Sequence, residues 1–574
     1  MKEYASQRIR AISPEMDPLR LGMGWQVDEL AKPQILVEST YGQSHPGSAH
    51  LNTLVDAAAQ AVDQNGGKAA RYFATDICDG MAQGHDGINY SLAHRDMIAN
   101  MIEIHACATT FDGGVFIASC DKAVPAQLMG IGRVNIPSIV VTGGVMDAGP
   151  NLLTLEQIGK YSAMKERGEI SEEQLTSYKH SACPSCGACS FMGTASTMQI
   201  MAEALGLMLP GGALLPATSP ELVRMAALAG EQVLFLAREG LCPRDIVTRA
   251  SFENAIMVHA AISGSTNSLL HLPAIAHEFG ITLDADTFDR IHRNVPYLLD
   301  IRPAGRWPAQ FYHYAGGTPG IMEQLLPLLH LDALTVTGET VGENLRKLRQ
   351  SGYYERCAQE LAPWGLSREE IIRPASNPIS AHGAVAVLRG NLAPEGSVVK
   401  HSAVPKEMFQ ATLRARVFDC EEDAIHAVLT GAIHPGDAVF IRYEGPKGSG
   451  MPEMFYTTEA IASDPKLSAS IALITDGRFS GASKGPAIGH VSPEAAQGGP
   501  IALVEENDLI RVDIPARTLD IVGASGVELP PAEVTALLAR RRAAWQPRPA
   551  KYEKGVLKLY SEHAVSAMMG GYMA

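Results

Sequence analysis

The sequence predicts an α/β protein in two parts: a layered N-terminal domain with a mostly parallel sheet, and a C-terminal domain built like a β-barrel. Two observations support this prediction. From about residue 30 to 370, apolar strand-like runs alternate with helical patterns, as in a parallel sheet covered by helices. Near residue 375 short strands begin to follow one another at close spacing, with Gly, Pro and Asp between them. We therefore expect domains at 1–375 and 376–574.

Three runs in the N-terminal part are typical of buried parallel strands: QILVEST (34–40), GVFIASC (114–120) and IPSIVVTGG (136–144). Each is apolar along its length and ends in small or polar residues, as expected of a strand covered on both faces. Helical patterns follow, one from Ser196 through TMQIMAEALGLML and one over 222–237. This part should therefore hold its functional groups at the carboxyl ends of the strands.

The C-terminal part shows a denser strand pattern that ends in a helical stretch. From about Pro531 onward the sequence is typical of helix. The predicted strands before it are GSVVKHSAV (396–404), DAVFIRYEG (437–445), ASIALITDG (469–477), PIALVEEN (500–507) and LIRVDIP (509–515).

Composition excludes several classes of protein. The chain has 574 residues, of which 46% are hydrophobic and 19% charged, with a net charge of −15 and no run rich in Lys or Arg. Nucleic acid and anionic membrane surfaces are therefore not expected partners. No apolar run approaches the ~18 residues of a membrane span, and the charged start lacks a signal core, so we expect a cytoplasmic protein. Nine cysteines, an odd number in a long chain, argue against a disulfide framework.

Three cysteine motifs are candidates for metal chemistry. CPSCGAC (183–189) has a spacing that suits zinc or iron, and taken alone it favours a zinc knuckle or an inert turn. SCDK (119–122) and ICDG (77–80) each follow a strand-like run and place an aspartate directly after a cysteine. A zinc knuckle does not require carboxylates such as those of Asp79 and Asp121. A site that binds one metal through sulfur and another through oxygen uses both kinds of side chain.

The C-terminal part adds two Gly-rich motifs. YEGPKGSGMPEM (443–454) is not a phosphate-binding loop, because it lacks the GK[ST] ending, and it carries Glu453. ITDGRFSGAS (474–483) follows a strand and places Ser480 near Arg478. A solvated turn is the commoner role for such a serine, and a reactive one would need a metal or Arg478 to stabilise its alkoxide.

Two further features stay open at this level. GSTN (264–267) could form a polar turn over the site or an ordinary helix N-cap. The 18 histidines show no metal-binding spacing, although His490 follows the Ser480 loop closely and is an alternative base.

Taken together, the motifs resemble the dihydroxy-acid dehydratase family, which includes the branched-chain biosynthetic dehydratase, 6-phosphogluconate dehydratase and the sugar-acid (aldonate) dehydratases. The resemblance runs from about Gly22 to the C-terminal region. The matching segments, in order, are CDGMAQGHDGINYSLAHRD, SCDKAVPAQLMG, CPSCGACSFMGTASTM, ISGSTNSLLHLPAI, GNLAPEGSVVK, RYEGPKGSGMPEM and ITDGRFSGASKGPAIGHVSPEA.

This resemblance implies an N-terminal α/β domain that holds an iron–sulfur cluster and Mg²⁺. It also implies a C-terminal barrel like the swivelling domain of aconitase that closes over the cluster. Matched residue by residue, it assigns Cys120 and Cys189 to the cluster, Asp79, Asp121 and Glu453 to magnesium, Lys122 to magnesium as a carbamate, and Ser480 to catalysis as the base.

One departure from the family pattern concerns the third cluster cysteine. Many members carry it in a Pro-Cys-x-x-His motif, whereas this chain reads HPGSAHL, with Gly47 in the cysteine position. Cys78, directly before Asp79, resembles a subset of the sugar-acid dehydratases. We therefore expect Cys78 to be the third ligand, with Cys186 in reserve, and the departure leaves the cluster type, [2Fe-2S] or [4Fe-4S], open.

The expected reaction is removal of water from a 2,3-dihydroxy carboxylic acid to give a 2-oxo-3-deoxy acid. MGWQVDEL (23–30) and the cysteine of ICDG resemble the sugar-acid branch, so a pentonate or hexonate is the favoured substrate. The alternative is 2,3-dihydroxyisovalerate and its homologue. A non-catalytic iron–sulfur redox protein and a zinc-stabilised binding protein are the alternatives from other classes. We expect a homodimer or homotetramer.

Overall fold

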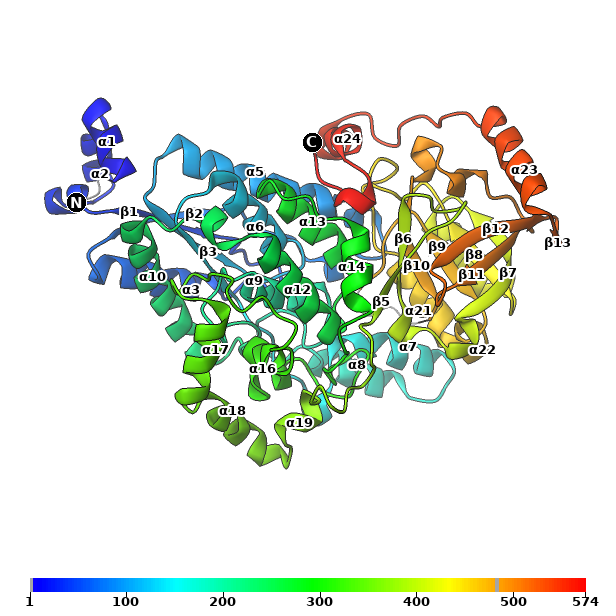
Figure 1. Ribbon diagram of the computed structural model, residues 1–574, viewed down its shortest axis with the longest axis horizontal. Coiled ribbons are helices and arrows are strands. Elements are labelled where there is room, and N and C mark those ends of the chain that lie inside the picture. Colours follow the sequence, from blue (N-terminus) through cyan, green and yellow to red (C-terminus); the bar gives the residue numbers. More distant parts are fainter. Residues whose placement is uncertain (1–3, 481–484) are drawn as a thin grey trace.

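The computed structural model describes residues 4–480 and 485–574. Figure 1 shows an N-terminal α/β part followed by a C-terminal part built around a curled sheet. This arrangement confirms the predicted fold class. Within the described ranges, no helix combines the length and the apolar character that crossing a bilayer requires.

The N-terminal part is organised around a four-stranded parallel sheet in the order β2-β1-β3-β4. The strands are β1 (Gln34–Ser39), β2 (Lys68–Phe73), β3 (Gly113–Ala118) and β4 (Ser138–Thr142). Every residue of β1, β3 and β4 is buried, which explains why their apolar runs could be recognised as strands. The strand-like run expected before ICDG is confirmed as β2, which lies at the sheet edge and is partly exposed, so its residues are less apolar than those of the other strands.

Helices cover this sheet. α3 (Leu51–Gln64) packs against α10 (Pro220–Glu239), and both contact the strands. α5 (Tyr90–Ala108) and α6 (Ala123–Val134) pack together, and α6 contacts both β3 and α9 (Thr194–Ala204).

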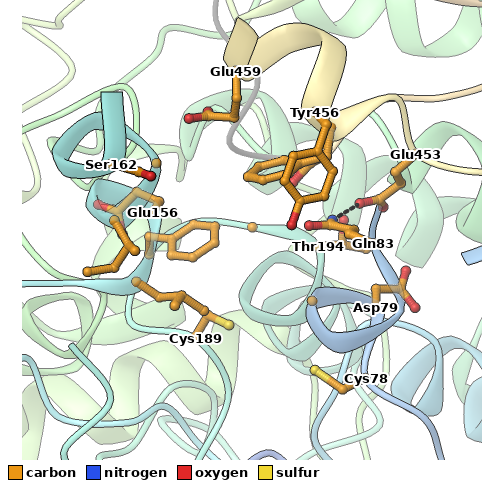
Figure 2. Close-up of a pocket in the computed structure, with 18 of the residues that line it drawn as sticks. Cys78, Asp79, Gln83, Glu156, Ser162, Cys189, Thr194, Glu453, Tyr456 and Glu459 are labelled. Atoms are coloured by element: carbon orange, nitrogen blue, oxygen red, sulfur yellow. Dashed lines mark hydrogen bonds between the residues drawn. The ribbon is translucent and has the colours of Figure 1, made fainter. Parts of the chain in front are cut away.

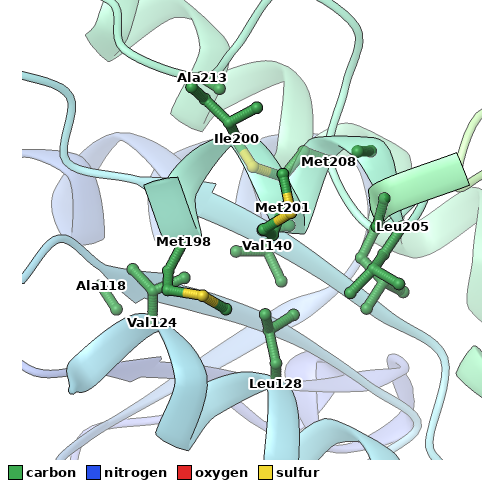
Figure 3. Packing of buried hydrophobic residues seen from close by; sticks show 14 of the residues in the cluster. Ala118, Val124, Leu128, Val140, Met198, Ile200, Met201, Leu205, Met208 and Ala213 are labelled. Carbon is green, nitrogen blue, oxygen red and sulfur yellow. The ribbon is translucent and has the colours of Figure 1, made fainter. Parts of the chain in front are cut away.

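α9 is a core helix, since all of its residues are buried. Figure 3 shows Met198 and Met201 of this helix inserted among Val124 and Leu128 of α6 and Val140 of β4. Both predicted helices are confirmed, although the first ends earlier than its apolar pattern. It ends at Ala204 because Gly206 (φ +84°) adopts a left-handed conformation that stops the helix.

The C-terminal part holds a curled mixed sheet in the order β13-β12-β11-β7-β8-β9-β10-β6-β5. The strands from β7 to β10 are parallel and the other pairs antiparallel. A bridge between Arg389 and Thr518 joins the β5 end to β12, so the sheet curls towards closure. The described strands are β5 (Val385–Leu388), β6 (Gly396–Lys400), β7 (Gln410–Phe418), β8 (Asp437–Ile441), β9 (Ala472–Thr475), β10 (Ala487–Ser492), β11 (Leu509–Asp513), β12 (Thr518–Ala524) and β13 (Val527–Glu528).

Four of the five predicted C-terminal strands are confirmed as β6, β8, β9 and β11. The prediction at 500–507 is wrong, because this segment forms the short 3₁₀ helix η9 (Pro500–Leu503). Pro500 has no N–H to donate to a strand partner, so the apolar run that follows it packs as a turn. The predicted helical end is confirmed as α23 (Pro531–Ala544) and α24 (Gly555–His563).

The chain end ties the two parts together. The buried guanidinium of Arg95, on α5, donates hydrogen bonds to the carbonyls of Gly570 (3.2 Å) and Gly571 (3.0 Å). Around it, α24 packs on α5 in a small separate core. We propose the same domain boundary as above, near residue 375, because it falls between α19 (Arg368–Ile371) and β5.

Candidate active site

A cavity of about 500 Å³ lies between the two parts of the chain. One side is formed by segments that follow the strands of the parallel sheet, and the other by the C-terminal part, including α21 (Phe455–Ser463). Figure 2 shows side chains from both sides pointing into it. The predicted site residues that line this central cavity are Cys78, Asp79, Cys120, Asp121, Cys189, Glu453 and Ser480.

The parallel sheet sets the positions of two of the motifs. Cys120 and Asp121 lie in the turn between β3 and α6, just past the carboxyl end of a central strand. Cys78 is the N-cap of the short helix α4 (Asp79–Ala82), which follows the end of β2. Because parallel strands bring their carboxyl ends to one edge, the two Cys-Asp pairs meet there.

Three carboxylates converge at this edge. Asp79, Asp121 and Glu453 each offer an oxygen, and these oxygens all lie within 4.8 Å of one another. Glu453 reaches the group from the C-terminal part, in the loop before α21. Oxygen ligands from several carboxylates suit a hard divalent cation such as Mg²⁺.

Two buried cations face these carboxylates. The ammonium of Lys122 lies 2.7 Å from Asp79 and 4.0 Å from both Asp121 and Glu453. The guanidinium of Arg478 pairs with Glu453 and lies 3.6 Å from Asp79. An ammonium has no lone pair for a metal, so a ligand role for Lys122 would require the carbamate, which stays a prediction.

The opposing charges separate the pKa values of the two aspartates. Burial alone would raise the pKa of Asp79, but the charges of Lys122 and Arg478 and the hydroxyl of Ser91, 2.8 Å away, lower it to about 2. Burial raises the pKa of Asp121 to about 7, and the neighbouring carboxylates add to this effect against the attraction of Lys122. Of the two aspartates, Asp121 is therefore the one that gains a proton first as the pH falls.

Two amides hold Glu453: one belongs to GSTN, whose role the sequence left open, and the other, Gln83, was not singled out from the sequence. The buried amide of Asn267 donates to one of its oxygens at 2.9 Å and also to the Thr194 hydroxyl at 2.8 Å. Gln83 donates to the other oxygen at 3.1 Å, a contact drawn as a dashed line in Figure 2. GSTN therefore brings an amide to the site, and the Asn267 side chain makes no cap bond to α13 (Ser268–Glu278).

Three cysteines share the cavity with the carboxylates. Figure 2 shows the sulfurs of Cys78 and Cys189 directed into the same space, and the thiol of Cys120 interacts with the Cys78 sulfur. That interaction, together with His45 nearby, outweighs burial and lowers the pKa of Cys78 to about 6. The reserve candidate, Cys186, does not line this cavity.

The structure also describes the surroundings of Gly47. A Cβ at this position would lie 2.7 Å from the Cys120 sulfur, so a side chain here would point at that sulfur. The position where the resemblance expects a cysteine therefore faces the same group of sulfurs, and Cys78 reaches Cys120 from another segment.

Ser480 lines the same cavity as the carboxylates, but the last part of its predicted motif, 481–483, lies outside the described residues. His490 borders a small neighbouring cavity of about 20 Å³ that Ser480 also lines. Burial lowers the pKa of His490 to about 3, which makes it a weak base. Ser480 lines the central cavity and His490 does not, and the role of Ser480 as the base stays a prediction.

The remaining walls differ in character. Apolar side chains cover part of the surface, whereas Figure 2 shows Glu156, Ser162 and Glu459 gathered on the side away from Asp79. The apolar and aromatic lining residues are Leu155, Ile158, Phe191, Ile425, Leu429, Phe455 and Tyr456.

Comparison with known proteins assigns the family. Residues 32–344 match the Dihydroxy-acid/6-phosphogluconate dehydratase N-terminal family and residues 370–571 match its C-terminal counterpart. The chain is 46% identical to dihydroxy-acid dehydratase 1 of Methanosarcina acetivorans over 95% of both chains. It is 45% identical to dihydroxy-acid dehydratase of Moorella thermoacetica over 100% of both. The chain therefore belongs to the dihydroxy-acid/6-phosphogluconate dehydratase family and is a hydro-lyase that acts on dihydroxy acids.

Proposed function

We propose that this enzyme removes water from a 2,3-dihydroxy acid with a short branched apolar chain, such as 2,3-dihydroxyisovalerate. Two findings support this choice over the sugar acid that the sequence motifs favour. The relatives at 46% and 45% identity are both named dihydroxy-acid dehydratase. Apolar side chains such as Leu155, Ile158 and Phe191 also offer a surface for a branched alkyl chain rather than for hydroxyl groups.

We propose that Asp79, Asp121 and Glu453 hold Mg²⁺. Their oxygens lie within 4.8 Å of one another, and Asp121 keeps a side-chain exposure of 25%, so a cation can reach them from the cavity. Lys122 and Arg478 pair with two of the same carboxylates, those of Asp79 and Glu453. This convergence of residues from both parts of the chain on one cavity is the observation that carries the proposal.

We propose that Cys78, Cys120 and Cys189 hold the iron–sulfur cluster. All three line the cavity, and the sulfurs of Cys78 and Cys120 interact there, so one cluster could reach all three thiolates that iron requires. Lewis-acid activation of the substrate's carboxylate and hydroxyl groups is the chemistry that the two cofactors supply when bound. The cluster type, [2Fe-2S] or [4Fe-4S], stays open. The cytoplasmic location and the assembly into a homodimer or homotetramer stay predictions.

The protein's own residues perform the remaining steps. Ser480, as the alkoxide, takes the proton from C2. The positive charges of Arg478 and Lys122 both lie beside the Asp79 carboxylate and favour anions there. The hydroxyl on C3 leaves as water with the proton that Ser480 took from C2, which regenerates the alkoxide, and the resulting enol tautomerises to the 2-oxo acid. Asn267 and Gln83 hold Glu453 in place during this sequence.

A sugar acid is the second candidate, because the polar groups of Glu156, Ser162 and Glu459 lie on the side away from Asp79, where a longer polyhydroxy chain would reach them. The test is an anaerobic assay of the reconstituted enzyme with 2,3-dihydroxyisovalerate and a panel of pentonates and hexonates, with detection of the 2-oxo acid. We expect kcat/KM for 2,3-dihydroxyisovalerate to exceed that for every aldonate by roughly tenfold or more. A higher value for any aldonate would reverse the assignment. Zinc in place of iron in the purified protein would overturn the cofactor assignment.

A further inference from the structure

Two buried histidines connect the GSTN turn to the C-terminal part of the chain. His259 lies on α12 (Arg249–Ala261) and His292 at the end of α14 (Ala285–His292), and α14 packs on both α12 and β5 (Figure 1). His259 is fully buried and His292 is 1% exposed. Neither histidine lines the central cavity, and the proposed function gives neither of them a role.

The partners of the two rings fix the position of each proton. The backbone N–H of Val385, on β5, can only donate, and its nitrogen lies 3.2 Å from Nδ1 of His292, so this Nδ1 is an acceptor. Nε2 of His292 therefore carries the proton and donates it to Nδ1 of His259, 3.0 Å away. Nε2 of His259 in turn donates to the carbonyl of Ser265 at 2.9 Å. Burial lowers the pKa of both imidazoles, in agreement with this neutral arrangement.

The GSTN turn needs support because the chain enters it in an unfavourable conformation. Ser263, directly before the turn, has a φ of +53°, and this left-handed conformation costs free energy for a serine. Lys400 of β6 donates to the Ser263 carbonyl at 2.8 Å, and the histidine pair reaches the carbonyl of Ser265. A Cβ on Gly264, between them, would lie 2.4 Å from Cδ2 of His259, so the turn packs directly on the imidazole.

The turn extends this support to the carboxylate group of the central cavity. The hydroxyl of Ser265, a fully buried residue, accepts the backbone N–H of Asn267 at 3.2 Å. The backbone N–H of Ser265 donates to the hydroxyl of Thr197, on α9, at 3.1 Å. The side-chain amide of Asn267 then donates to Glu453 at 2.9 Å. A continuous series of contacts through Ser265 and Asn267 therefore joins His259 to Glu453.

We propose that His259 and His292 are positioning residues that hold the GSTN turn through their hydrogen-bonded imidazoles, and so keep Asn267 and Glu453 in place for Mg²⁺. The inference rests on the proposed magnesium site, in which Glu453 is a ligand. The Nε2–H of His259 is the group that meets the turn, so replacing it tests the role directly.

The test measures the Kd for Mg²⁺ of the reconstituted enzyme by isothermal titration calorimetry. His259→Phe keeps a ring and removes the donor, and His259→Asn is too short to reach Ser265 but keeps a polar partner for His292. In both variants we expect the Kd to rise about three- to tenfold, the effect of losing one neutral hydrogen bond. His259→Gln can place an amide N–H where Nε2 lies, so its Kd should stay within about twofold of the wild-type value.

Two controls separate positioning from a general loss of stability. In an Asn267→Ala background, His259→Phe should raise the Kd no further, because the histidine acts through Asn267. His105→Phe removes a histidine that bonds Glu38 at 2.9 Å and does not line the cavity, so it should leave the Kd unchanged.

The outcomes separate this inference from the proposed function. A wild-type enzyme that binds no Mg²⁺ would refute the magnesium site itself. Where the wild type binds Mg²⁺, an unchanged Kd in a folded His259→Phe or His259→Asn variant would overturn the positioning role and leave the site intact. A His259→Gln variant as weak as His259→Asn, an equal loss in His105→Phe, or an additive loss in the Asn267→Ala background would also overturn it.

Discussion

Replacing Asn267 with alanine should weaken Mg²⁺ binding without touching any proposed ligand. The Asn267 amide is fully buried and donates to Glu453 at 2.9 Å, so Asn267→Ala removes a hydrogen bond to a charged group. Such a bond contributes ~1.5–3 kcal/mol, which corresponds to ~10- to 150-fold in affinity. Gln83 and Arg478 also contact Glu453, so in the variant they would still hold its side chain partly in place. We therefore expect the lower end of the range, a roughly tenfold increase in the Kd for Mg²⁺.

Isothermal titration calorimetry of the reconstituted enzyme with Mg²⁺ measures this change. Asn254→Ala is the matched control, because Asn254 is equally buried but bonds the backbone of His330. It should lower the melting temperature and leave the Kd unchanged. A folded Asn267→Ala variant with the wild-type Kd would show that Glu453 does not depend on Asn267, and would count against Glu453 as a ligand.

Three further predictions concern the proposed ligands and base. Ser480→Ala should lower kcat by ~10²- to 10⁴-fold with unchanged cluster absorbance and Mg²⁺ affinity; near-normal turnover in a steady-state assay would remove the serine from the mechanism. Mg²⁺ affinity should decrease as the pH is lowered through about 7, because the pKa of Asp121 is raised to about 7 and its protonated form cannot bind the ion. Calorimetric Kd values that are equal at acidic and neutral pH would contradict this. Cys78→Ser should lose iron and sulfide on reconstitution, whereas Cys186→Ser should retain both, and the reverse pattern in metal analysis would exchange their roles.

Local patterns in the sequence predicted most of the fold. The buried strands β1, β3 and β4 could be recognised because their residues are apolar on both faces, and the end of β3 correctly located Cys120 and Asp121. A strand-like run was also expected before ICDG, but the bounds of β2 could not be predicted because this edge strand is partly exposed and less apolar. At Pro500 an apolar run folded as a 3₁₀ turn, since such a run predicts burial without specifying backbone conformation.

The site was less accessible to local reasoning because it is assembled from distant segments. The family resemblance assigned Glu453 to magnesium, and the structure brings it to Asp79 and Asp121. Nothing local links Glu453 to Asn267, 186 residues earlier, or His45 to Asp76. Hydrogen bonds between buried side chains follow from tertiary packing, so a single sequence contains no signal for them.

Anomalous diffraction from crystals grown anaerobically with iron, sulfide and Mn²⁺ in place of Mg²⁺ tests the central claim most directly. Data at the iron and manganese edges separate the two metals within one cavity. We expect iron beside the sulfurs of Cys78, Cys120 and Cys189, and a manganese ion among the oxygens of Asp79, Asp121 and Glu453. Iron at Cys186, or manganese away from these carboxylates, would contradict it.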